Sequence, residues 1–210
     1  MAYKEKLLDS IFDCFANFDY IKTGDIPNID LYMDQVTTFM DEHLKASKRR
    51  EEDKVLTKTM INNYAKNHLL PPPVKKKYSR EHLLVLIFIY YFKGFLSFQD
   101  IQSILNPLTE RFFQSDSDIS LEQIYQEVFQ MGHDELQLIE EDIKRLYQRS
   151  SEAFADAPKE EGEFLRAFSI ICLLSFDVYV KKQLIEKIID DYNAERFCDV
   201  PKTEEKNKQE

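Results

Sequence analysis

Eleven basic side chains and three acidic ones lie between Lys45 and Arg80, in a chain of 210 residues whose formal net charge is −10. This segment therefore carries a charge of +8, and the rest of the chain carries −18. Its cations form three clusters: Lys48-Arg49-Arg50, Lys58 with Lys66, and Lys75-Lys76-Lys77 with Arg80. Cations gathered on one part of an acidic protein are typical of a surface that binds a polyanion. The alternative interpretation is a basic loop that is simply hydrated.

A short polar helix is predicted between two of these clusters. Thr57 stands where an N-cap residue should be, and the helix must end before the three prolines at 71–73. Helical spacing turns Met60, Ile61 and Tyr64 inward and leaves polar side chains outward, namely Lys58, Asn62, Asn63 and Lys66. A narrow helix that carries amides and cations is suited to the major groove of DNA. We expect the lysines after the proline turn to contact phosphates, which position a protein without reading sequence.

Residues that could support catalysis or metal binding show no functional spacing. None of the four histidines belongs to a His-Glu-x-x-His or Glu-x-x-His pattern; they are His43, His68, His82 and His133. Four glycines leave no glycine-rich phosphate loop. Cys172 lies in an apolar helical segment, where a thiol is usually unreactive, and the other cysteines, Cys14 and Cys198, are far from it. We therefore expect neither an enzyme nor a bound cofactor or metal.

The elements that hold these residues are expected to be helices, because glycine is scarce and helix-forming residues are plentiful. Apolar spacing predicts helices at residues 3–18, 29–46, 80–93 and 97–105. Ser79 and Ser97 stand as N-caps of the last two, and Asn106-Pro107 predicts a break. Beyond the break the chain is acidic and helical, with a cap at Ser120 and one or two helices over residues 164–197. Residues 201–210 have the composition of a disordered tail.

Two apolar runs need to be distinguished from membrane spans. Leu83–Phe92 has ten residues. Phe164–Val180 contains Arg166 and Asp177 and is shorter than the roughly 20 residues that a span requires. We expect both runs to be buried core helices. Unpaired cysteines, and an N-terminus without an apolar signal region, favour a cytoplasmic protein that does not enter a membrane.

The order of residues from Leu69 onward is distinctive, because LLPPPVKKKYSREHLL is followed by GFLSF and then DIQSIL. Over residues of about 56–105 this order resembles the winged helix-turn-helix of MerR-type bacterial regulators. Tyr64 matches the tyrosine of that family's recognition helix, and Leu69-Leu70-Pro71 its leucine–proline step. The other matches are Lys76-Lys77-Tyr78 for the Arg-x-Tyr of the wing, Ser79-Arg80-Glu81-His82-Leu83 for a capped helix, and Gly94–Phe98 with Asp100–Leu105 for the closing turn and helix. The whole chain also resembles a bacterial family of unknown function that carries this module.

The resemblance implies an all-α protein with a MerR-like DNA-binding module at residues 26–108. An N-terminal helix within residues 1–25 would precede it, and an acidic helical bundle at residues 109–200 would follow. The resemblance also implies a homodimer on double-stranded DNA, with dimer contacts in the bundle, a region that also hosts effectors in that family. The residues expected at DNA are Lys48, Arg49, Arg50, Lys58, Asn62, Asn63, Tyr64, Lys66, Lys75, Lys76, Lys77, Tyr78 and Arg80.

The function expected from these features is that of a transcriptional regulator. Its 57–67 helix would contact the major groove and its 75–80 wing would hold phosphates. The alternative is a non-enzymatic helical adaptor that uses the same scaffold to bind another protein. The net charge of −10 favours the adaptor, because it raises the cost of approaching DNA.

Overall fold

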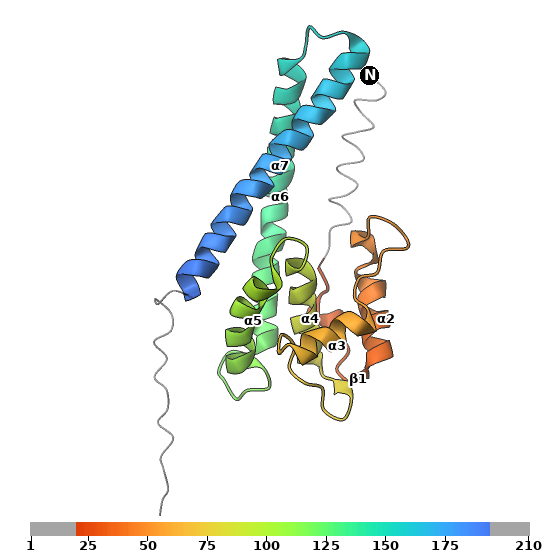
Figure 1. The fold of residues 1–210 in the computed structure, drawn as a ribbon, viewed down its shortest axis with the longest axis vertical. Coiled ribbons are helices and arrows are strands. Elements are labelled where there is room, and N and C mark those ends of the chain that lie inside the picture. The colour runs from red at the N-terminus through yellow and green to blue at the C-terminus, as the bar shows by residue number, and fades with distance from the viewer. Residues whose placement is uncertain (1–19, 194–210) are drawn as a thin grey trace, which may run out of the picture.

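A computed structural model of the chain describes residues 20–193. The helix expected at residues 3–18 and the tail expected at 201–210 lie outside the described residues. Within them the protein is mostly helical, which confirms the predicted class, and the helices are joined by one small sheet (Figure 1). The elements in chain order are η1 (Thr23–Asp25), β1 (Leu31–Tyr32), α2 (Met33–His43), η2 (Lys45–Ser47), α3 (Lys58–Lys66), β2 (Lys77–Tyr78), α4 (Arg80–Phe92), α5 (Phe98–Phe112), α6 (Leu121–Ala153) and α7 (Lys159–Asp191).

Helix α4 forms the centre of the core, and its sequence explains why. Every residue from His82 to Ile89 is buried, so the helix is covered on all sides. A helix that is apolar around its whole circumference is stable only when it is surrounded in this way. The run Leu83–Phe92 is therefore a buried core helix as predicted, although its last residues are only partly covered.

The two strands pair in an antiparallel ladder that joins the start of α2 to the start of α4. Leu31 lies opposite Tyr78, and Tyr32 opposite Lys77. Leu31 and Tyr78 are buried, whereas Tyr32 is 51% exposed, which is the alternation expected of a sheet with one covered face. The helix predicted at 29–46 therefore begins only at Met33, because the two residues before it are used in the strand.

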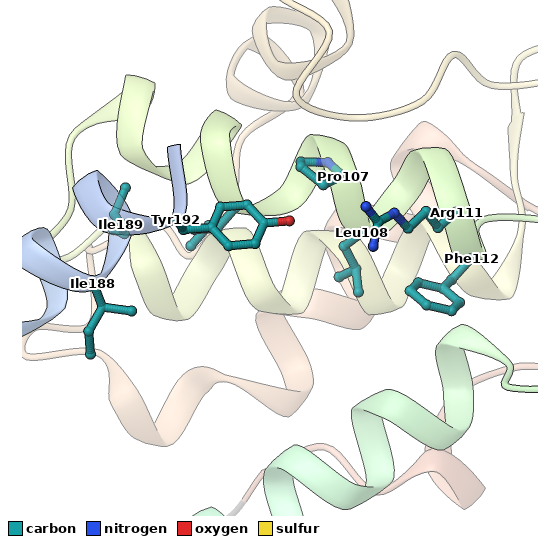
Figure 2. A pocket seen from close by; sticks show the side chains of 8 residues that line it. Pro107, Leu108, Arg111, Phe112, Ile188, Ile189 and Tyr192 are labelled. Carbon is teal, nitrogen blue, oxygen red and sulfur yellow. The ribbon is translucent and has the colours of Figure 1, made fainter. Parts of the chain in front are cut away.

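The break predicted at Asn106-Pro107 is wrong, because helix α5 runs through both residues, and Figure 2 shows Pro107 within the helix. The helix continues through Pro107 to Phe112, so the expected module boundary at residue 108 falls within it. A proline inside a helix removes one backbone hydrogen bond and costs about 3 kcal/mol. Leu108 and Phe112 lie beyond the proline and pack against the core, and their burial offsets this cost.

Helices α6 and α7 have 33 residues each and form a long antiparallel hairpin that extends away from the other elements (Figure 1). Ser150 Oγ on α6 lies 2.9 Å from the carbonyl oxygen of Arg166 on α7 and also contacts Ser169 Oγ. The N-terminal half of α6 packs on α4, and the C-terminal end of α7 packs on α5. No described helix is both long enough and apolar enough to cross a membrane.

The exposure of α7 contradicts its predicted role as a buried core helix. Phe164 is 67% exposed, Phe168 53%, Ile171 61% and Val178 60%. Cys172 is exposed as well, so the expectation of a buried thiol is also wrong. The sequence pattern identified an apolar helix correctly, but α6 covers only one of its sides.

Arg80 joins three parts of the chain. Its Nε and Nη2 donate to the two carboxylate oxygens of Glu122 on α6, at 2.9 and 2.8 Å. Nη1 donates to the carbonyl of Ile26 at 2.5 Å, and Nη2 to that of Thr23 at 2.6 Å. The side chain is only 21% exposed. The guanidinium therefore connects η1, the first turn of α4 and the first turn of α6.

Replacing Arg80 with methionine should destabilise the fold. The change leaves a partly covered carboxylate and two carbonyls without their donor, and we expect a loss of about 2–3 kcal/mol in the free energy of unfolding. Urea unfolding followed by helical circular dichroism measures it. The matched control is Arg145→Met, whose ion pair with Asp142 lies on the solvated face of α6 and should contribute less than about 1 kcal/mol. Equal losses in the two variants would contradict the assignment.

Candidate nucleic-acid interface

Helix α3 has the limits and orientation expected of it. Thr57 Oγ1 accepts the N–H of Met60 at 3.2 Å and caps the first turn. At the other end His68 has a φ of 56°, and the N–H of Leu69 donates to the carbonyl of Tyr64 at 2.9 Å, as in a Schellman motif. Ile61 and Tyr64 face the core. The outward face is exposed and consists of Lys58, Asn62, Asn63 and Lys66.

Contacts on both sides hold α3 in place. The Nζ of Lys93, at the end of α4, donates to the carbonyl of Val55 at 2.6 Å, just before the helix. Burial lowers the pKa of Lys93. After the helix, Nε2 of Gln102 on α5 donates to the carbonyl of Asn67 at 2.6 Å. The helix is therefore anchored to α4 and α5 while its polar face stays open, and the α6–α7 hairpin does not cover it (Figure 1).

A tight turn presents the first two lysines of the 75–77 cluster. The N–H of Lys77 donates to the carbonyl of Val74 at 2.9 Å. Lys75 and Lys76 have φ values of 51° and 64°, so both central residues are left-handed, as in a type I′ turn. Such turns favour Asn-Gly, because a side chain in this conformation costs roughly 1–2 kcal/mol per residue. Both lysine side chains are exposed, so this turn accepts strain and carries two cations at its tip.

Lys77 has a different environment from the two lysines at the tip. It belongs to β2, and its Nζ lies 5.3 Å from the centre of the Tyr32 ring on the paired strand. This is a cation–π distance. Its side chain is partly covered, so it keeps one side on the sheet while its charge stays near the surface.

Four predicted DNA contacts occupy other positions in the structure. Tyr64 and Tyr78 are core residues, with 9% and 3% of their surface exposed, and burial raises the pKa of both phenols. Arg80 is committed to the internal network described above. Lys48 pairs with Asp41 at 2.7 Å and is mostly covered. Aromatic and basic residue types identified these four positions in the sequence, but the types alone do not distinguish a surface ligand from a structural contact.

Arg49 and Arg50 are exposed, yet their surroundings weaken the predicted phosphate contact. They are followed by three exposed acids, Glu51, Glu52 and Asp53. These acids, with Asp41 and Glu42 of α2, line a groove that reaches the first turn of α3 at Lys58, and Lys48 and Lys54 line it as well. The run of three acids is visible in the sequence, but its position beside the acids of α2 appears only in the fold. Lys66 and the three lysines of the 75–77 cluster do not line this groove.

His82 lies behind the proline segment that leads to this turn. Its side chain is 1% exposed, and its Nδ1 accepts the backbone N–H of Ser79 at 2.9 Å. The proton of the neutral ring is therefore on Nε2, which is buried near the carbonyls of Pro71 and Pro72 without a well-aligned hydrogen bond to either. Burial lowers the pKa of His82, while the carbonyls of Pro72 and Pro71 and the charge of Asp30 act in the opposite direction.

The described residues contain no group of three or more His, Cys, Asp or Glu side chains that could hold a metal ion. The geometry instead defines a mostly helical protein with one anchored, exposed polar helix and one lysine-tipped turn.

Residues 21–128 match the family model described as a domain of unknown function, DUF1836. The chain belongs to this family. A search of curated proteins gave no match, and neither did a search of solved structures. The predicted kinship with a family of unknown function is thus confirmed, whereas the MerR-like resemblance stays a hypothesis.

The burial of His82 predicts a stability that depends on pH. Above the ordinary histidine pKa of 6.5 the ring is neutral in both the folded and the unfolded chain, so stability is full. As pH falls below 6.5 the unfolded chain takes up the proton first, and folding loses up to about 1.4 kcal/mol per pH unit until the folded pKa is reached. The measurement is the urea midpoint at about pH 7.5 and about pH 5.5.

His82→Gln is the control, because glutamine at this position also accepts the Ser79 N–H and does not titrate. Its midpoint should fall less on acidification than that of the original chain. The same fall in both proteins would mean that other groups cause the pH dependence.

Proposed function

We propose that the protein is a DNA-binding regulator of MerR-like type. Helix α3 contacts the major groove through Lys58, Asn62, Asn63 and Lys66. The turn of Lys75 and Lys76, with Lys77 beside it, contacts phosphates. The observation that carries the proposal is the presence of two features within one short stretch of chain: a capped helix that presents only polar residues, and a strained turn that presents two lysines.

Anchoring supports this assignment of α3. Base contacts require a helix whose side chains are already in position, because ordering them on binding costs free energy. The hydrogen bonds from Lys93 and Gln102 hold the segments before and after α3. The amides of Asn62 and Asn63 are exposed and have the donors and acceptors that base edges require.

The acidic groove beside the first turn of α3 limits how DNA can lie. The groove holds five carboxylates against three lysines, and Lys48 already pairs with Asp41, so an excess of negative charge remains there and the DNA backbone should approach from the side of the turn. In this arrangement Arg49 and Arg50 contribute less than the lysines of the turn, and Tyr64, Tyr78, Arg80 and Lys48 contribute through the fold alone.

The proposal includes a homodimer formed through α7. Phe164, Phe168, Ile171, Ser175 and Val178 follow one another at spacings of four and three residues, which is the pattern of a coiled-coil seam. All five are exposed. A monomer rarely leaves so many neighbouring large apolar side chains in water. A second copy offers the same stripe and can cover it symmetrically, which suits a protein that binds paired half-sites.

A helical adaptor is the second candidate function. The same apolar stripe favours it, because a different protein could cover α7 as well as a second copy could. Oligomeric state and duplex binding together separate the two candidates. A dimer that binds duplex supports the regulator, and a monomer that binds none at low salt supports the adaptor.

Lys75→Ala/Lys76→Ala/Lys77→Ala should weaken binding to random-sequence duplex and reduce its salt dependence. The affinity of the original chain should fall with salt at a slope of about −0.9 per neutralised phosphate, and the triple variant should lose about two to three units of that slope. Fluorescence anisotropy at several salt concentrations measures both quantities.

The matched control removes three lysines from α7, as Lys181→Ala/Lys182→Ala/Lys187→Ala. The net charge changes equally, but these lysines pair with acids on their own helix. Their loss should leave the slope unchanged. Identical slopes for the two triple variants would show that overall charge, and not the turn, governs binding.

Ile171→Glu should convert the dimer to a monomer, because it places two carboxylates in the centre of the α7 seam. Folding should be unaffected, since Ile171 is 61% exposed within one chain. Light scattering coupled to size-exclusion chromatography measures the mass. Ile119→Glu, at a residue that is 54% exposed before α6, is the control and should remain a dimer. An original chain that is monomeric at high concentration would remove this part of the proposal.

A further inference from the structure

The outer face of the small sheet carries a row of three side chains next to the lysine turn. Tyr32 lies opposite Lys77 in the β1–β2 ladder, and Lys77 forms a further antiparallel bridge with Val74. Residues that lie directly opposite one another in antiparallel strands have their side chains on the same face of the sheet. The other pair of the ladder, Leu31 with Tyr78, is buried and faces the core. The row of Tyr32, Lys77 and Val74 therefore lies on the face that is turned to solvent.

Two members of the row are large apolar groups that the fold leaves largely in water. Tyr32 is 51% exposed and Val74 is 61% exposed. The cation–π contact with Lys77, whose Nζ lies 5.3 Å from the centre of the Tyr32 ring, covers only part of that ring. The fold thus gains little from burial of Val74 and only part of what burial of Tyr32 would supply. Both side chains have apolar surface that a partner can cover.

The charge beside the row indicates the chemistry of that partner. The turn carries two more lysines at its tip, between Val74 and Lys77 in the chain, so the apolar row is continuous with a cluster of cations. The nearest acids to Tyr32 in the sequence are Asp30 and Asp34, both exposed, and the three lysines outnumber them. A DNA strand offers the complementary pattern, because anionic phosphates alternate along it with deoxyribose rings whose C–H groups are apolar.

We propose that the row of Tyr32, Lys77 and Val74 packs against deoxyribose groups of the DNA strand whose phosphates lie on the lysine turn. This inference rests on the proposed function and adds to it a contact that is neither ionic nor specific for base sequence. Tyr32 belongs to β1, outside the stretch of about 56–105 whose residues indicated DNA binding. The surface that meets DNA therefore extends from the turn across the sheet to a segment that precedes α2.

The two kinds of contact respond differently to salt. Each phosphate that a lysine neutralises releases counterions, so the lysines set the slope of affinity against salt concentration on logarithmic scales. An apolar contact with deoxyribose releases no counterions. Its loss should therefore weaken binding by the same factor at every salt concentration and leave the slope as it was.

Tyr32→Ala in the full chain tests the contact, with random-sequence duplex and fluorescence anisotropy at several salt concentrations. Binding should weaken by about fivefold to tenfold at each concentration with no change in slope, because the variant loses the apolar area of the ring. Tyr32→Phe keeps the ring and should bind like the original chain. Ile119→Ala, which removes an apolar group that is 54% exposed before α6, is the control and should also bind like the original chain.

Val74→Thr is a second variant, for the case that alanine at position 32 disturbs the sheet. It keeps the branched shape and replaces a methyl group with a hydroxyl, so it should weaken binding by about twofold at every salt concentration. Helical circular dichroism of each variant distinguishes a lost contact from a lost fold.

The possible failures are distinguishable. Duplex binding that Tyr32→Ala leaves unchanged would overturn the deoxyribose contact and leave the proposed function standing. Tyr32→Phe binding as weakly as Tyr32→Ala would assign the effect to the hydroxyl, and a reduced slope in Tyr32→Ala would assign it to a displaced Lys77; either result overturns the apolar contact. An original chain without salt-dependent duplex binding would remove the proposed function and this inference together.

Discussion

The arrangement of the whole chain depends on one guanidinium. Arg80 binds a carboxylate of α6 and two carbonyls near η1 from the first turn of α4, so it fixes three segments whose partners lie 57 residues before it and 42 residues after it in the sequence. The central helix α4 follows directly from it, and the strand before it pairs with the start of α2. The position of the sheet, and with it the position of the lysine turn, therefore rests on a hydrogen-bonded charge at the edge of the core. An arginine–carboxylate pair has a defined geometry, so it favours one arrangement of the segments that it joins over the alternatives.

Local signals in the sequence located most of the helices correctly. Thr57 and Ser97 cap α3 and α5 as predicted, and both caps involve partners only three residues away. The inward side of α3 followed from apolar spacing alone, since Ile61 and Tyr64 are buried. Interactions at short range are visible in a sequence because the two partners stand at a fixed separation. The break predicted at Pro107 is absent, because Leu108 and Phe112 pack against the core and keep the helix intact beyond the proline. This packing involves residues far away in the sequence, so local spacing does not show it.

Two cations expected at the candidate interface have structural roles instead, and the cause is the same for both. Arg80 and Lys48 are cations of the right kind in the right segment, but their acidic partners, Glu122 and Asp41, lie elsewhere in the chain. A sequence does not reveal such pairings, so every lysine and arginine of the cluster had equal weight. The apolar segment of α7 presents the opposite problem. Its composition shows that it must be covered, and only the fold shows that its own chain covers one side and leaves Phe164 and Ile171 in water.

The turn at Lys75 and Lys76 has a consequence for how the chain tolerates change. Folding alone would favour asparagine and glycine at these two positions, because they relieve the left-handed backbone at no loss of core contacts. Charge favours lysine. Backbone conformation and charge therefore favour different residues at these two positions. Selection for thermal stability should replace the lysines with asparagine or glycine, and selection for activity should keep them. Lysines that remain at both positions under selection for activity would then be identified as residues that bind the protein's partner.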